Sequence, residues 1–169
     1  MQADDRAEPT HQIGEAMQSL HPDQISVLRI RAVLASVAAL IVGWVLDIGL
    51  LRQTPTPEYA LPGVVLLAAL YFVLIYPARR HRSWGYAEGE DELAIRSGIL
   101  VQRRTIVPFG RVQHIDVAQG PIQRPWGIAT LTLHTAGTRG AEVSLPGLEV
   151  GLAEEMRDRI RGKIRQDLV

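Results

Sequence analysis

The chain carries, at residues 32–51, the run AVLASVAALIVGWVLDIGLL and, at residues 59–76, the run YALPGVVLLAALYFVLIY. At about 1.5 Å of rise per helical residue, runs of roughly 20 residues span about 30 Å, the thickness of a bilayer's hydrocarbon core. The segment RQTPTPE at residues 52–58 joins them and is long enough only to reverse the chain direction. The two runs therefore predict an antiparallel hairpin of two transmembrane helices with both chain termini on one side.

Positive charge gathers at the open end of this hairpin. Lys and Arg near helix ends are held back in the cytoplasm during insertion, and the loop offers only Arg52, balanced by Glu58. The flanking arginines are Arg29, Arg31, Arg79, Arg80 and Arg82. We therefore expect a multi-pass protein of the cell (inner) membrane with both termini in the cytoplasm.

Asp47 is the one charge inside a predicted span. An acid within a membrane is a candidate for a proton or ion path. However, Asp47 lies about 24 Å along the helix from Arg31, near the outer interface, and no second charge in either run forms a relay. We interpret it as a boundary residue that reaches water or Arg52.

Composition limits the function classes. The chain has no cysteine, which excludes disulfides, thiolate metal sites and cysteine nucleophiles. The formal net charge is zero, and the part after residue 78 is only slightly basic, far from the basic stripe of a nucleic-acid binder. We expect no nucleic acid partner and no cofactor.

The hairpin divides the chain into a polar, loosely held tail at residues 1–22, the hairpin at 23–77 and one soluble domain at 78–169. Apolar residues alternate with a period of two through much of this domain, which predicts short antiparallel strands at 84–87, 93–96, 100–108, 112–119, 128–136 and 141–145. The period then changes to four, which predicts an amphipathic C-terminal helix at about 149–166. Its apolar stripe is Leu152, Met156, Ile160, Ile164 and Leu168.

Several motifs fall in order along this domain: IRSGI at 95–99, RRTIVP at 103–108, RVQHID at 111–116, QGPIQR at 119–124, Trp126-Gly127 and LTLHTA at 131–136. Together with the preceding hairpin, the chain resembles the bacterial PH-like (pleckstrin-homology-like) membrane proteins of the YdbS type. The resemblance implies a two-helix membrane anchor followed by an α+β domain, a small antiparallel barrel or sandwich capped by a C-terminal helix. It does not imply an activity.

Many lipid-binding PH domains hold phosphoinositides with basic residues between their first two strands. Here the corresponding segment, residues 88–92, reads EGEDE and would repel a phosphate. We therefore expect no specific phosphoinositide site.

The turn-rich segment 120–127 is the candidate interaction loop, because isoleucine, arginine and tryptophan side chains there are suited to contact a partner. Its candidate contact residues are Ile122, Gln123, Arg124 and Trp126. The alternative is that Ile122 and Trp126 tuck into the end of the domain while the prolines set the turn. The leading hypothesis is a non-enzymatic protein-interaction or assembly module of the cell envelope, whose partners are the lipid bilayer and other membrane proteins or copies of itself.

Two other functions remain open. An anionic-lipid surface sensor would use Arg79, Arg80, Arg82, Arg103 and Arg104. A remote alternative is a metal-dependent enzyme using His114, Asp116 and His134, since two residues at i and i+2 project from one face of a strand and a third can lie on the next strand. We interpret these three as a hydrogen-bonded surface group and expect neither a metal nor catalytic residues.

Overall fold

The computed structural model describes residues 17–49, 60–136 and 142–166. It divides into two compact units, a hairpin unit of Pro22–His81 and a sheet unit of Met1–His21 with Arg82–Val169. The predicted loop at 52–58, the turn at 137–140, Ala141 and Leu168 lie outside the described residues.

The described part of the hairpin unit is almost entirely helical: α1 (Gln24–Gly49), α2 (Ala60–Leu74) and α3 (Tyr76–Arg82), whose last residue belongs to the sheet unit. Two stretches, Gln24–Gly49 and Pro62–Arg82, are long and apolar enough to cross a membrane, and few of their residues are buried. Their large apolar side chains point outward, as a lipid-facing surface requires. Gly43 is buried, and a Cβ on it would lie 3.5 Å from the Val65 side chain, at ordinary van der Waals distance, so α1 and α2 pack against each other at this position.

The helical stretch of the second span continues beyond Tyr76, where the predicted span ends. The helix breaks at Ile75 and resumes as α3, which carries Pro77 in its first turn. A proline there lacks a backbone N–H and crowds the preceding turn, which accounts for the break. The amide of Arg79 still donates to the Ile75 carbonyl at 3.2 Å, so Arg79, Arg80 and Arg82 lie on a helix rather than in a loop after it.

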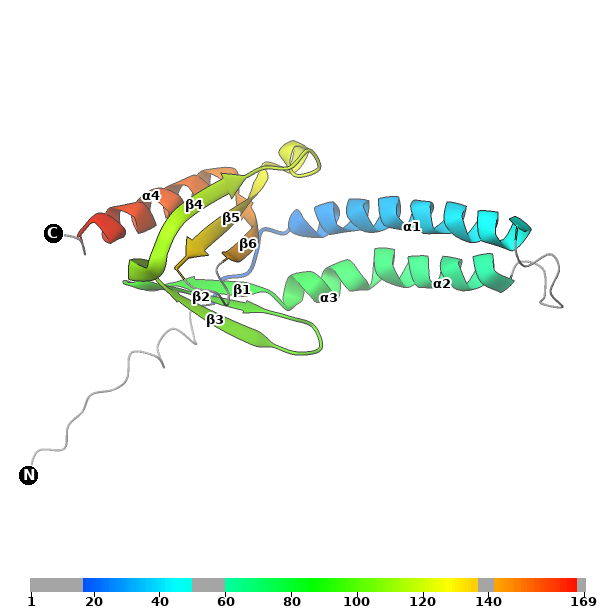
Figure 1. Ribbon diagram of the computed structural model, residues 1–169, viewed down its shortest axis with the longest axis horizontal. Coiled ribbons are helices and arrows are strands. Elements are labelled where there is room, and N and C mark those ends of the chain that lie inside the picture. Colours follow the sequence, from blue (N-terminus) through cyan, green and yellow to red (C-terminus); the bar gives the residue numbers. More distant parts are fainter. Residues whose placement is uncertain (1–16, 50–59, 137–141, 167–169) are drawn as a thin grey trace, which may run out of the picture. The chain divides into compact units, whose positions relative to one another are not determined.

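Two three-stranded antiparallel sheets form the sheet unit (Figure 1). The first sheet consists of β1 (Gly85–Glu88), β2 (Glu92–Ser97) and β3 (Arg103–Pro108), and the second of β4 (Val112–Ala118), β5 (Ile128–Thr135) and β6 (Glu142–Glu149). A short 3-10 turn, η3 (Phe109–Arg111), connects them, and a second, η4 (Arg124–Trp126), lies between β4 and β5. No strand pairing joins the two sheets within the described residues, so the expected barrel or sandwich is not closed into a barrel.

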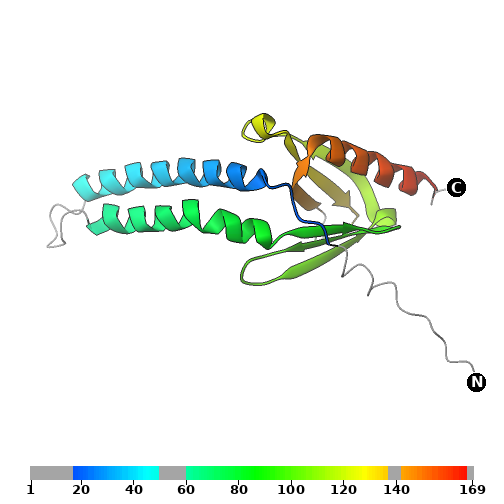
Figure 2. The same ribbon diagram turned by 180° about the vertical axis from the view of Figure 1, so that it is seen from behind.

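Helix α4 (Val150–Gln166) packs on the second sheet, and the core lies beneath it (Figure 2). The predicted apolar stripe supplies Met156 and Ile160, both fully buried, while Leu152 and Ile164 pack at the edge. The sheets contribute Leu93, Ile95, Val107, Leu131, Leu133, Leu145 and Leu148, and η3 contributes Phe109. The expected hairpin with an α+β domain capped by a C-terminal helix is confirmed.

Three local features differ from the sequence expectations. The third strand, expected at 100–108, begins only at Arg103, because residues 98–102 form the connection from β2. Residues 17–21, expected to belong to a loosely held tail, add to the sheet unit: Gln18 pairs with Tyr86 beside β1, and Leu20 is 3% exposed in the core. Strand β6 also runs through Pro146 and Gly147 instead of stopping before them. The register shifts there, and a bulge tolerates a proline because it does not need every ladder hydrogen bond.

Candidate interaction site

The segment between β4 and β5 folds into two consecutive tight turns. The amides of Gln123 and Arg124 donate to the Gly120 carbonyl at 2.9 and 3.1 Å, and the Trp126 amide donates to the Gln123 carbonyl at 3.1 Å. Gly127 ends η4 with φ 60° and ψ 23°, a left-handed conformation that glycine adopts without strain. The prolines and glycines of the sequence motif thus encode one defined loop conformation.

The side chain of Gln123 braces this loop from the inside. Its Oε1 accepts from the Gly120 amide at 3.0 Å, and its Nε2 donates to the Thr130 hydroxyl on β5 at 3.1 Å. Gln123 is only 5% exposed. It was predicted to be a contact residue, and the structure places it inside, where a glutamine satisfies a donor and an acceptor at once.

Two further hydrogen bonds attach the loop to the domain. The Gln119 side chain donates to the Ile128 carbonyl at 3.2 Å, and the Val150 amide at the start of α4 donates to the Gly127 carbonyl at 3.0 Å. The loop is therefore held at both ends by neighbouring elements.

Arg124 and Trp126 are the exposed large side chains of this loop. Trp126 is 37% exposed and Arg124 is also exposed, whereas Ile122 is half-buried. The sequence left open whether Ile122 and Trp126 face a partner or pack into the end of the domain. In the structure, Ile122 is the more deeply packed of the two, and Trp126 is the more exposed. The loop presents one cation and one aromatic ring on a braced backbone.

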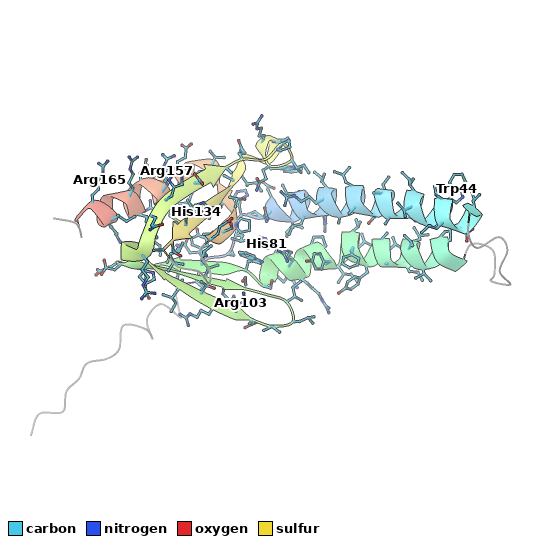
Figure 3. All side chains as sticks on the ribbon, viewed as in Figure 1. Trp44, His81, Arg103, His134, Arg157 and Arg165 are labelled. Carbon is cyan, nitrogen blue, oxygen red and sulfur yellow. The ribbon has the colours of Figure 1, made fainter. Side chains whose placement is uncertain are left out.

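The predicted basic residues fall on two elements. Arg79, Arg80 and Arg82 lie on α3, whereas Arg103 and Arg104 begin β3. All are exposed except Arg80, which is half-buried and donates to the Tyr76 hydroxyl at 3.1 Å. Figure 3 labels Arg103 on its strand.

The structure brings together His114, Asp116 and His134 as the expected hydrogen-bonded surface group. His114 lies directly opposite His134, and the Nε2 atoms of the two rings lie 2.9 and 3.1 Å from the two oxygens of Asp116. Both carboxylate oxygens are thus engaged by imidazoles on an exposed strand face, where Figure 3 labels His134. Within the described ranges no group of three such side chains is arranged to hold a metal ion.

The acidic segment between β1 and β2 has a structural partner that the sequence did not reveal. Arg159 of α4 binds Glu88 with two hydrogen bonds of 3.1 and 2.8 Å, and this bond raises the pKa of Arg159. Lys163, one helical turn later, donates to the carbonyls of Gly89 and Glu90 and lies over the Phe109 ring. The sequence feature that could have indicated this contact was an acidic segment together with two cations, Arg159 and Lys163, placed four residues apart on the predicted C-terminal helix.

The neighbouring Tyr86 responds to the same environment. Burial in the core raises the pKa of its phenol, and the negative charge of Glu88 raises it further. The β1–β2 segment therefore serves to dock helix α4: Glu88 pairs with Arg159, and the backbone carbonyls of Gly89 and Glu90 accept from Lys163.

Comparison with known proteins extends over most of the chain. Residues 25–164 match the bacterial PH domain family model. The chain is 35% identical over 159 residues to the UPF0699 transmembrane protein YdbS of Bacillus subtilis (strain 168), covering 92% of both chains. It is 26% identical over 106 residues to the UPF0699 transmembrane protein YdbT of the same organism, covering 62% of this chain and 22% of that protein. No solved structure matches it significantly.

Proposed function

The chain belongs to the bacterial PH domain family, and from this premise we propose that it is a non-enzymatic, membrane-anchored module that binds other proteins through the braced loop 120–127. Two transmembrane helices hold the PH-like domain at a membrane. The positions of the arginines support a cell-membrane protein whose termini and PH-like domain are cytoplasmic.

The observation that carries this proposal is the contrast between Gln123 and its neighbours. Gln123 is buried and hydrogen-bonded at both ends of its amide, while Arg124 and Trp126 beside it are exposed. A side chain presented from a rigid loop loses little conformational freedom when a partner binds. Tryptophan and arginine are also the residues that most often dominate binding energy at protein interfaces.

The membrane anchor limits the class of partner. Proteins that share a bilayer meet at high effective concentration, so a small contact surface is sufficient. We infer that the partner is another membrane protein, either a second PH-like membrane protein or a copy of this chain.

Crosslinking of the full-length protein in its native membrane tests the proposal. Arg124→Ala and Trp126→Ala should each lose the crosslinked partner, because they remove the exposed cation and ring without touching the Gln123 brace. Arg111→Ala is the matched control, since Arg111 is an exposed arginine on η3 of the same domain. Equal crosslinking in all three variants, or no partner for the wild type, would overturn the proposal.

A second candidate function is recognition of anionic lipid, favoured by the exposure of Arg79, Arg82, Arg103 and Arg104. Exposed arginines near a membrane each gain roughly 1 kcal/mol from an anionic leaflet. This function requires that the contact between the domain and anionic nanodiscs weakens as the salt concentration rises. A contact that is equal at low and high salt would exclude it.

A further inference from the structure

Three consecutive aliphatic side chains are exposed at the tip of the β2–β3 hairpin. Ile99, Leu100 and Val101 are 36%, 96% and 80% exposed. They belong to the connection between Ser97 and Arg103, the last paired residues of the two strands. Figure 1 shows this connection at the end of a hairpin that projects away from helix α4 and from the second sheet.

The tip has a defined shape. Gly98 has a φ of 112°, and a Cβ on it would lie 2.0 Å from the Val101 carbonyl oxygen, so the chain folds back closely on itself. Only glycine permits this approach. The tight turn leaves the side chains of Leu100 and Val101 directed outward, since neither packs against the core. An apolar tip that is shaped and solvent-facing indicates a contact surface rather than a missing piece of core.

The charged residues of the β2–β3 connection and of the strand ends beside it, residues 96–104, are all positive. The sequence from 96 to 104 reads RSGILVQRR and contains no acid. Arg96 and Arg104 are directly opposite each other across the two strands. Like charges in directly opposed positions disfavour strand pairing, so the arrangement does not serve the stability of the hairpin. An external anionic surface would compensate it.

The membrane in which the chain is anchored would provide such a surface. Helix α3, which follows α2 along the chain, ends at Arg82, and β1 begins at Gly85, so residues 83–84 alone separate the last helix of the hairpin unit from the sheet. This short connection keeps the domain at the membrane at all times. Aliphatic side chains flanked by arginines are the composition of segments that insert into the headgroup and acyl boundary of anionic bilayers.

We propose that Ile99, Leu100 and Val101 insert into the leaflet facing the domain, while the exposed Arg103 and Arg104 bind its anionic headgroups. The hairpin tip would then be a second membrane contact, which fixes the orientation of the domain on the bilayer. This contact rests on the second candidate function, recognition of anionic lipid, because Arg103 and Arg104 belong to both. It uses a different element from loop 120–127, so it is independent of the protein-binding function.

The absence of cysteine in the chain allows a direct test. A single Leu100→Cys substitution, at a side chain that contacts almost nothing, introduces a unique site for a nitroxide label in the full-length protein. The labelled protein is reconstituted in nanodiscs of phosphatidylcholine with and without phosphatidylglycerol. Accessibility of the label to oxygen, which concentrates in lipid, is compared with its accessibility to a water-soluble nickel complex. The matched control is Gln113→Cys, at an exposed residue of β4.

With phosphatidylglycerol, we expect the label at position 100 to be several-fold more accessible to oxygen than to the nickel complex, and the label at position 113 to show the reverse. Replacing Arg103 and Arg104 by glutamine should reduce the inserted fraction relative to the free fraction by roughly fivefold per arginine. A label at position 100 that stays in water in both kinds of nanodisc would overturn the proposal. A label shielded from both reagents would also overturn it, because a protein would then cover the tip.

Discussion

Replacing Gln123 by leucine should loosen the interaction loop without unfolding the domain. Leucine has a similar size but can neither accept from the Gly120 amide nor donate to the Thr130 hydroxyl, which now lie 3.0 and 3.1 Å from the glutamine side chain. Each hydrogen bond contributes about 1 kcal/mol net, and the part-buried Gly120 amide loses its acceptor. We therefore expect the free energy of local opening to fall by about 2 kcal/mol, which corresponds to roughly a 30-fold increase in the open population.

Amide hydrogen exchange of the full-length protein in nanodiscs measures this opening directly. Amides of residues 120–128 should exchange roughly 30-fold faster in Gln123→Leu, and those of α4 beyond Val150, whose amide donates to Gly127, should change little. Thr130→Val removes only one of the two hydrogen bonds and should produce about a fivefold increase. Gln113→Leu makes the same chemical change at an exposed position of β4 and should leave the exchange of the loop unchanged.

Two outcomes would refute this reasoning. Wild-type exchange rates at residues 120–128 in Gln123→Leu would mean that the turns hold the loop without the side chain. An equal acceleration throughout both sheets and α4 would mean that Gln123 supports the whole domain rather than the loop.

Two further predictions concern the contact between the β1–β2 segment and α4. Burial and Glu88 raise the pKa of the Tyr86 phenol above its ordinary value of 10.0, so the folded state favours the protonated phenol. The protonated phenol therefore stabilises the folded state fully below about pH 10. This contribution is lost as the pH rises through the folded-state pKa. The melting temperature of the wild type should therefore fall more steeply above about pH 10 than that of Tyr86→Phe. Melting temperatures of the two proteins that fall in parallel would contradict this. Arg159→Met should lower the free energy of unfolding by about 0.5–1 kcal/mol in urea titrations at low salt, while Arg157→Met, which loses only the exposed pair that Arg157 forms with its neighbour Asp158, should change it less; equal effects would exclude a specific role for the pair with Glu88.

The sequence was sufficient for the features that depend on neighbouring residues along the chain. Each span is a continuous apolar run, and its helical state follows because a backbone in lipid must satisfy its own hydrogen bonds. The stripe through Met156 and Ile160 predicted the buried face of α4, and the alternation of apolar residues predicted the strands at 112–119 and 128–136. The family resemblance was likewise carried by short motifs in order and is confirmed by the match over residues 25–164.

Only the tertiary structure decided the features that depend on residues far apart in the sequence. The pairing of Glu88 with Arg159 and the burial of Leu20 both bring distant segments of the chain together. The passage of β6 through Pro146 follows from a bulge in its pairing with β5. The same reason explains the interaction loop: residue types alone could not tell whether Gln123 or Trp126 faces solvent, because that depends on Thr130 across the turn. The helices, the strands and the list of candidate residues were readable from local sequence, whereas their exposure and partners were set by long-range packing.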